Sequence, residues 1–145
     1  MRIRPMSRAD LEDVARLCAQ LGYPSTMEQM ARRLGPLEAD PEAGLYVADA
    51  PPGGIVGWVY VRGVRPMTSD PRAEIWGLVV DADHRGAGVG AALMRHAEQW
   101  AREQGYADVR LHSNVVRTEA HRFYQGLGYQ ITKTSYVLSK SLRPA

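Results

Sequence analysis

The alternation of apolar and polar positions predicts short strands and amphipathic helices along the whole chain. In the N-terminal half, a strand over 3–5 precedes a helix over 7–21, whose apolar residues recur on one face. A capping box opens a second helix over 25–34, and Gly35-Pro36 is expected to stop it. An antiparallel hairpin with a Pro- and Gly-rich turn then covers residues 45–62.

The C-terminal half opens with a strand over 74–80 that is mostly apolar on both faces, which is typical of a central strand. The strongest helical periodicity covers 88–104, and a strand over 107–112 and a helix over 118–127 follow. Residues 129–142 predict one long strand or two short ones. This order predicts an α/β (α+β) fold, in which about four helices flank a mostly antiparallel mixed sheet with one parallel pair.

Composition and charge narrow the class of protein. With 145 residues, 45% of them hydrophobic, the chain suits a single domain over 1–145. Its 18 Lys and Arg residues against 16 Asp and Glu give a net charge of +2 without a basic run, so no nucleic-acid partner is expected. No stretch reaches the roughly 18 apolar residues of a membrane span, and no signal peptide precedes the first strand. We therefore expect a cytoplasmic protein without a membrane partner.

Neither disulfide nor metal chemistry is expected. Cys18 is the only cysteine and lies at helical spacing among apolar residues, which indicates a small buried side chain rather than a nucleophile. No His, Cys or carboxylate cluster has the spacing of metal ligands.

A glycine-rich turn, Arg85-Gly86-Ala87-Gly88-Val89-Gly90, opens the helix that follows the central strand. Three glycines in six residues would be costly inside a helix, but they suit backbone that approaches a ligand closely. A helix N-terminus attracts anions, and an arginine matches phosphate oxygens. The turn lacks the Gly-Lys-Ser/Thr ending of a P-loop and the spacing of a dinucleotide-binding turn. Without a ligand, it would be only a flexible connection.

Two motifs together resemble one family. Arg85-x-x-Gly88-x-Gly90 resembles the acetyl-CoA pyrophosphate loop of the GNAT superfamily of N-acetyltransferases. Downstream, Ala120-His121-Arg122-Phe123-Tyr124-Gln125-Gly126-Leu127-Gly128-Tyr129 is similar to that superfamily's A-x-x-F-Y-x-x-x-G-[FY] helix. The resemblance implies an acetyl-CoA-dependent N-acetyltransferase that uses no metal.

The resemblance also implies a cofactor site. In such enzymes the central strand bulges, here near Gly77, and splays from the next strand to leave a V-shaped gap for pantetheine. One departure concerns Asn114, because many members have an asparagine three residues before the motif alanine, where Arg117 stands here. The implied acetyl-CoA-binding residues are Leu78, Val79, Val80, Arg85, Gly86, Ala87, Gly88, Val89, Gly90, Asn114 and Tyr124.

Two residues are implied as catalytic. Tyr124 occupies the position of the tyrosine that protonates the departing CoA thiolate. The alternative is that Tyr124 is only a core aromatic residue of an amphipathic helix. Glu74 lies eleven positions before Arg85, the spacing of the general-base glutamate in histone acetyltransferases of this superfamily. Its alternative is a charged strand-end residue paired with Arg72. The backbone N–H of Leu78 is expected to stabilise the oxyanion that develops when the amine attacks the thioester carbonyl.

The acceptor is the least patterned part of the prediction. We expect direct transfer, in a ternary complex, to the primary amine of a small molecule. A protein or peptide N-acetyltransferase and a non-catalytic acetyl-CoA sensor are the alternatives, and homodimers are usual in the resembled family. Candidate pocket walls are the aromatic residues Tyr23, Tyr46, Trp58, Tyr60 and Trp76, and candidate attractors of an acidic acceptor are Arg62, Arg65 and Arg72.

Overall fold

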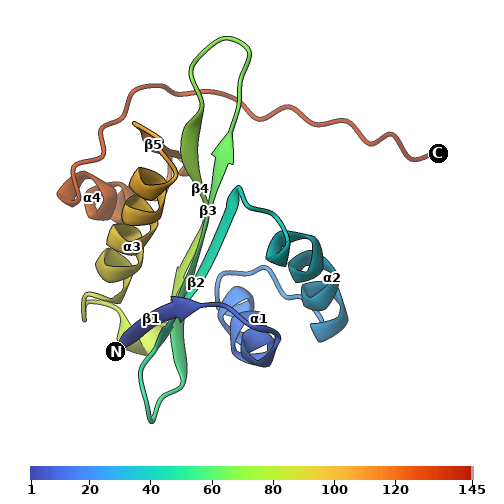
Figure 1. Ribbon diagram of the computed structural model, residues 1–145, viewed down its shortest axis with the longest axis vertical. Helices are drawn as coiled ribbons and strands as arrows, with labels where there is room; N and C mark the ends of the chain where they lie inside the picture. The colour runs from blue at the N-terminus through green and yellow to red at the C-terminus, as the bar shows by residue number, and fades with distance from the viewer. Residues whose placement is uncertain (145) are drawn as a thin grey trace. The chain divides into compact units, whose positions relative to one another are not determined.

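One mixed sheet organises the computed structural model, which describes residues 1–144 (Figure 1). Its strands lie in the order β1-β2-β3-β4-β5, so that each strand pairs with its neighbour in sequence. The pairs from β1 to β4 are antiparallel, and β4 and β5 are parallel, as the sequence predicted. The strands are β1 (Arg2–Pro5), β2 (Ala43–Asp49), β3 (Ile55–Val64), β4 (Arg72–Val80) and β5 (Val109–Leu111).

The chain divides into two compact units, one up to His112 and one from Ser113, and each is described by itself. The first unit holds the sheet, three α-helices and two 3₁₀ turns. The second holds α4 (Thr118–Gly126). The helical elements of the first unit are η1 (Arg8–Asp10), α1 (Leu11–Gln20), α2 (Met27–Glu38), η2 (Ala82–His84) and α3 (Val89–Glu103).

Helices cover both faces of the sheet in the first unit, with α1 and α2 on one face and α3 on the other (Figure 1). The α3 side is closely packed because Gly57 of β3 has no side chain. A Cβ there would lie 3.0 Å from Leu93 Cδ1 and 2.9 Å from the Val79 carbonyl oxygen. The core on the α1 and α2 side consists of Leu11, Val14, Leu17, Met30, Leu34, Val47, Ile55 and Val79.

Both predicted boundaries of α2 are wrong. The capping box uses Thr26 and Gln29 instead of Ser25 and Glu28: the Thr26 hydroxyl accepts from the Gln29 N–H at 3.1 Å, and the Gln29 side chain accepts from the Thr26 N–H at 2.9 Å. The helix also continues through Pro36 to Glu38. A proline in the last turn removes one backbone hydrogen bond, and burial of the apolar face that includes Leu34 outweighs that loss.

The predicted C-terminal strand or strands over 129–142 are also wrong. Residues 129–144 carry no strand and run extended in Figure 1. Their apolar side chains, among them Ile131, Val137 and Leu138, are exposed. A strand exists only when its backbone pairs with another strand, and the described part of the second unit contains none. Apolar alternation alone therefore misled the prediction.

Candidate active site

β4 loses one of its two neighbours halfway along its length. Its parallel partner β5 pairs only with Ala73, Glu74 and Ile75, whereas β3 pairs with β4 as far as Val80. Within residues 1–144, β4 therefore has no strand on its β5 side from Trp76 to Val80. Backbone N–H and C=O groups on such an edge remain available to an added extended segment.

A bulge lies at the point where the β5 pairing stops. Tyr60 of β3 faces Gly77, and Val61 faces Ile75, so that Trp76 is the extra residue. The bulge predicted near Gly77 is thus present one residue earlier. Gly77 has a different reason to be glycine, because a Cβ there would lie 2.6 Å from two carbons of the Trp58 ring.

The glycine-rich turn follows β4 and η2 directly and opens α3. Gly86 and Gly88 have positive φ angles of 80° and 84°, in the left-handed region that favours glycine, and Gly88 caps the helix. Residues 85–88 are exposed, whereas Val89 is buried against the sheet, so only the backbone of Val89 can face a ligand. No acidic residue lies in the first turn of α3. The exposed N-terminus of α3, with its positive helix end, is therefore suited to an anion.

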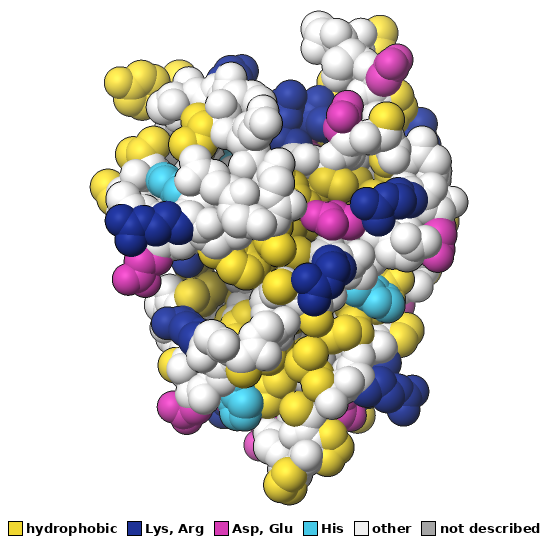
Figure 2. Space-filling view, turned by 90° about the vertical axis from the view of Figure 1, so that its left-hand side faces the viewer, with side chains coloured by type: hydrophobic (Ala, Val, Ile, Leu, Met, Phe, Trp, Pro, Cys, Tyr) yellow, Lys and Arg dark blue, Asp and Glu magenta, His cyan; other side chains and the backbone are white. Residues whose placement is uncertain are grey.

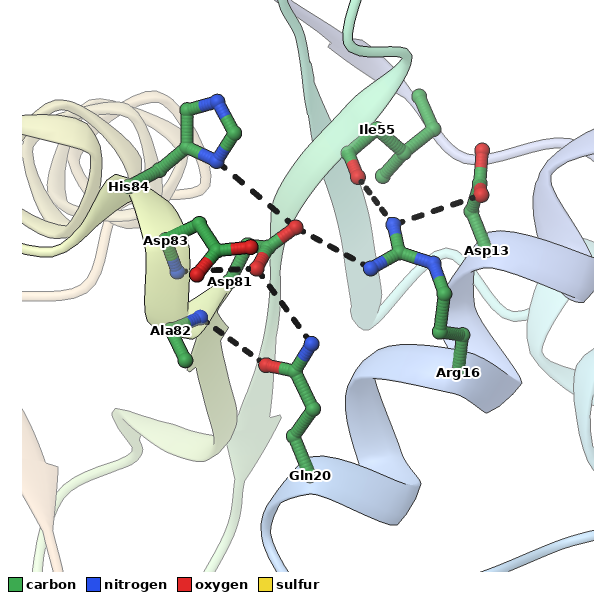
Figure 3. A network of polar contacts seen from close by, with 8 residues as sticks. All are labelled: Asp13, Arg16, Gln20, Ile55, Asp81, Ala82, Asp83 and His84. Atoms are coloured by element: carbon green, nitrogen blue, oxygen red, sulfur yellow. Dashed lines mark hydrogen bonds and ion pairs between the residues drawn. The ribbon is translucent and has the colours of Figure 1, made fainter.

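A buried carboxylate, Asp81, fixes the approach to this turn (Figure 3). Its Oδ2 accepts from Arg16 Nη1 at 3.1 Å, and its Oδ1 accepts from the Asp83 N–H at 3.1 Å and from Gln20 Nε2 at 3.4 Å. Gln20 completes the link, since its Oε1 accepts from the Ala82 N–H at 3.0 Å. Helix α1 is thereby bonded to the start of the turn.

Arg16 extends this network to β3, because its Nη2 donates to the Ile55 carbonyl at 3.1 Å. The Asp83 N–H lowers the pKa of Asp81, and Arg16 and Gln20 lower it further against the opposing effect of burial, so that the net pKa is lowered. Sequence reasoning missed these residues. The available signal was an aspartate at the end of an apolar strand, together with polar residues at i and i+4 on α1.

Glu74 is a paired, buried carboxylate. Its Oε2 accepts from Arg72 Nε at 2.9 Å, and its Oε1 accepts from the Trp76 indole Nε1 at 3.0 Å. Burial raises the pKa of Glu74, but the bonds from Trp76 and Arg72 and the nearby charges outweigh it, so the net pKa is lowered. Glu74 is therefore charged at neutral pH, and it pairs with Arg72, as the non-catalytic alternative expected.

An aromatic row lies beside Glu74 on the same face of the sheet. The rings of Tyr60 and Trp76 meet edge to face, with centroids 5.8 Å apart, and Arg62 lies 5.1 Å over the Trp76 ring. Of the other candidate wall residues, Tyr46 contacts His96 of α3 and Tyr23 is exposed, so neither joins the row.

The three candidate attractors of an acidic acceptor are all paired with acids, namely Arg62 with Asp40, Arg65 with Glu42 and Arg72 with Glu74. Basic and acidic side chains are also interspersed over the face drawn in Figure 2. Among residues 1–144, no group of three or more His, Cys, Asp or Glu residues is arranged to hold a metal ion.

The second unit carries Tyr124 and Asn114. Tyr124 lies on α4, with its ring 5.1 Å from that of Phe123 and 6.0 Å from that of Tyr129. Burial raises the pKa of the Tyr124 phenol, so it stays protonated at neutral pH. Asn114 Oδ1 accepts from the Val116 N–H at 3.1 Å, which makes it a turn-forming residue before α4.

Residues 9–129 match the acetyltransferase (GNAT) family, and this match runs across the boundary between the two units. The chain belongs to that family. N-acetyltransferase 8 of Mus musculus is 36% identical over 96 residues, which are 66% of this chain and 42% of that protein. N-acetyltransferase 8B of Homo sapiens is 38% identical over 71 residues, or 49% of this chain and 31% of that protein. The chain thus spans less than half the length of these relatives.

Solved structures agree on the fold. An aminoglycoside 6'-N-acetyltransferase of Acinetobacter haemolyticus has a TM-score of 0.81 at 22% identity, over 99% of this chain and 100% of that one. A putative acetyltransferase of Agrobacterium tumefaciens has a TM-score of 0.84 at 23% identity, over 97% of this chain and 100% of that one. The predicted GNAT-like fold class is confirmed, and the family match and the relatives support the expected enzyme class, an acetyl-CoA-dependent N-acetyltransferase. No helix in residues 1–144 is long and apolar enough to cross a membrane.

Proposed function

We propose that this protein transfers the acetyl group of acetyl-CoA to the primary amine of a small molecule, directly and in a ternary complex. The observation that carries the proposal is the half-paired β4, which loses β5 after Ile75 and leads through η2 into the glycine-rich turn. An open strand edge that continues into an anion site suits an extended ligand with phosphates at one end.

Acetyl-CoA fits the residues present. The backbone of Leu78, Val79 and Val80 would bind the pantetheine amides, and the amides of residues 85–90 would bind the pyrophosphate. The exposure of residues 85–88 and the absence of an acidic residue from the first turn of α3 support this assignment. Asn114 is retained as a cofactor-binding candidate through its side-chain NH₂, because its oxygen is already engaged in the turn. Acetyl-CoA supplies the acetyl group as a thioester.

The protonation states of Glu74 and Tyr124 suit the roles of general base and general acid. Glu74 is charged and would take a proton from the attacking amine, directly or through water, while its hydrogen bonds hold it in place. Tyr124 keeps its proton and would donate it at the sulfur. The Leu78 N–H, on the strand segment without a β5 partner, would stabilise the developing oxyanion. The homodimer and the cytoplasmic location also remain predictions.

The test is release of the CoA thiol from acetyl-CoA across amino acids, alkylamines, polyamines, aminoglycosides and short peptides. Release above background with a small amine supports the proposal, whereas release with peptides alone supports a peptide N-acetyltransferase. Acetyl-CoA binding without release with any acceptor would support a sensor. Tyr124→Phe should lower kcat about 10²-fold with little change in acetyl-CoA affinity, and the exposed Tyr136→Phe is the matched control.

A further inference from the structure

A cavity of about 360 Å³ lies in the first unit between α1, α2 and the sheet. Its walls are apolar side chains of α1, α2 and β2, among them Leu34 and Leu45, and two aromatic residues of β3, Trp58 and Tyr60. This volume is at the lower end of the roughly 300–1,000 Å³ of small-molecule pockets. The cavity therefore suits a compact organic molecule.

The only charge in the lining of the cavity is positive. Its lining contains no carboxylate, and Arg33 is its only charged residue. Arg33 donates to the Ser25 hydroxyl at 2.8 Å, and no carboxylate of residues 1–144 forms a salt bridge with it. A cationic group in this cavity would lose water, gain no anionic partner and meet a like charge, all of which oppose its binding.

The cavity connects to Glu74 through aromatic contacts within the first unit. Trp58 lies over Gly77 at the bulge, and Tyr60 contacts the Trp76 ring. Trp76 in turn donates to Glu74. An occupant with its apolar body in the cavity would present a polar end toward Glu74 and the bulge of β4.

We propose that the acceptor is a primary amine on an apolar body and carries no second positive charge. This inference rests on the proposed function and names the chemical class of its acceptor. It sets the protein apart from an enzyme for polycationic acceptors such as polyamines or aminoglycosides, because these need carboxylates that this cavity does not have.

Three amines with the same six-carbon chain test the proposal, since they differ only at the far end: hexylamine ends in methyl, 6-aminohexanoate in carboxylate and 1,6-diaminohexane in ammonium. We expect kcat/KM for hexylamine to exceed that for the diamine by at least tenfold, with 6-aminohexanoate above the diamine. An advantage of tenfold corresponds to about 1.4 kcal/mol. Equal rates, or a faster diamine, would overturn the inference while leaving the acetyltransferase intact. No release with any amine class would overturn both.

A charge reversal with a matched control locates the effect. Arg33→Glu should raise kcat/KM for the diamine relative to hexylamine at least fivefold. Arg32→Glu makes the same change at an exposed position of the same helix outside the cavity lining and should leave that ratio unchanged. Similar effects of both variants would mean that general surface charge sets the preference, and the proposal would fail.

A second pair of variants tests occupancy of the cavity. Cys18→Phe fills the cavity from α1 and should raise the KM for hexylamine at least tenfold with an unchanged KM for acetyl-CoA. Ala19→Phe adds the same ring on the exposed side of the helix and should change neither. An unaltered hexylamine KM in a folded Cys18→Phe variant would overturn the assignment.

Discussion

Gly77→Ala probes the contact that joins the β4 bulge to the cavity. A Cβ at this position would lie 2.6 Å from two Trp58 ring carbons, well inside ordinary carbon contact at about 3.5–4.0 Å. The indole must therefore move by about 1 Å, and overpacking of this kind costs about 1–3 kcal/mol. Because the cavity borders the indole, the displaced ring would also change the space available to the acceptor.

We expect the free energy of unfolding, measured by urea denaturation, to fall by about 1–3 kcal/mol. We also expect kcat/KM for hexylamine to fall by tenfold or more. Gly35→Ala is the control. Gly35 lies inside α2, and its added Cβ would lie at an ordinary contact distance, 3.5 Å, from the flexible end of the Arg8 side chain. That variant should keep its activity and gain about 0.4–1 kcal/mol.

A double-mutant cycle decides whether Trp58 is the cause. If the clash with the ring is the origin of the loss, Gly77→Ala should cost far less in a Trp58→Leu background, with a coupling energy of at least about 1 kcal/mol. Additive effects, with coupling below about 0.5 kcal/mol, would refute the reasoning and direct attention to the backbone of the bulge itself.

Three further predictions concern the remaining parts of the site. Gly88→Ala and Gly105→Ala both strain a positive φ and should each cost about 1–2 kcal/mol in urea unfolding, but only the first should weaken acetyl-CoA binding in calorimetry. Glu74→Gln should lower kcat by about 10²-fold. Since the Glu74 pKa is lowered, the wild-type kcat/KM measured from pH 6 to 9 should follow deprotonation of the amine, without a Glu74 titration. Asp81 has a lowered folded pKa, so its stabilisation is present above its unfolded pKa of about 3.9 and is lost as the pH falls through the folded value. Asp81→Asn should therefore lose about 1–2 kcal/mol in urea at pH 7 and approach the wild type below pH 4.

Local signals predicted most of the architecture. Strand alternation, helix periodicity and the glycines of the 85–90 turn are each contained in a short stretch of chain, and the structure places β1–β4, α1 and α3 close to the predicted ranges. The errors have a common physical origin in tertiary context. Packing of an apolar face extended α2 past Pro36, and the 129–142 segment has the apolar content of a strand but no partner in its unit.

The sequence resemblance placed a bulge near Gly77 but not its register, because the register of a bulge is a property of two paired strands. Strict alternation along β4 would turn Glu74 and Leu78 to the same face. Because Trp76 is an extra residue, the alternation reverses after it. Val79, instead of Leu78, therefore lies on the same face as Glu74 and joins the core under α1, and Trp76 donates to Glu74 on this face. Trp76 and Gly77 then both lie on the face occupied by the Trp58 ring. This ring leaves no room for a side chain at position 77. The need for glycine at position 77 is therefore a consequence of this shift in register.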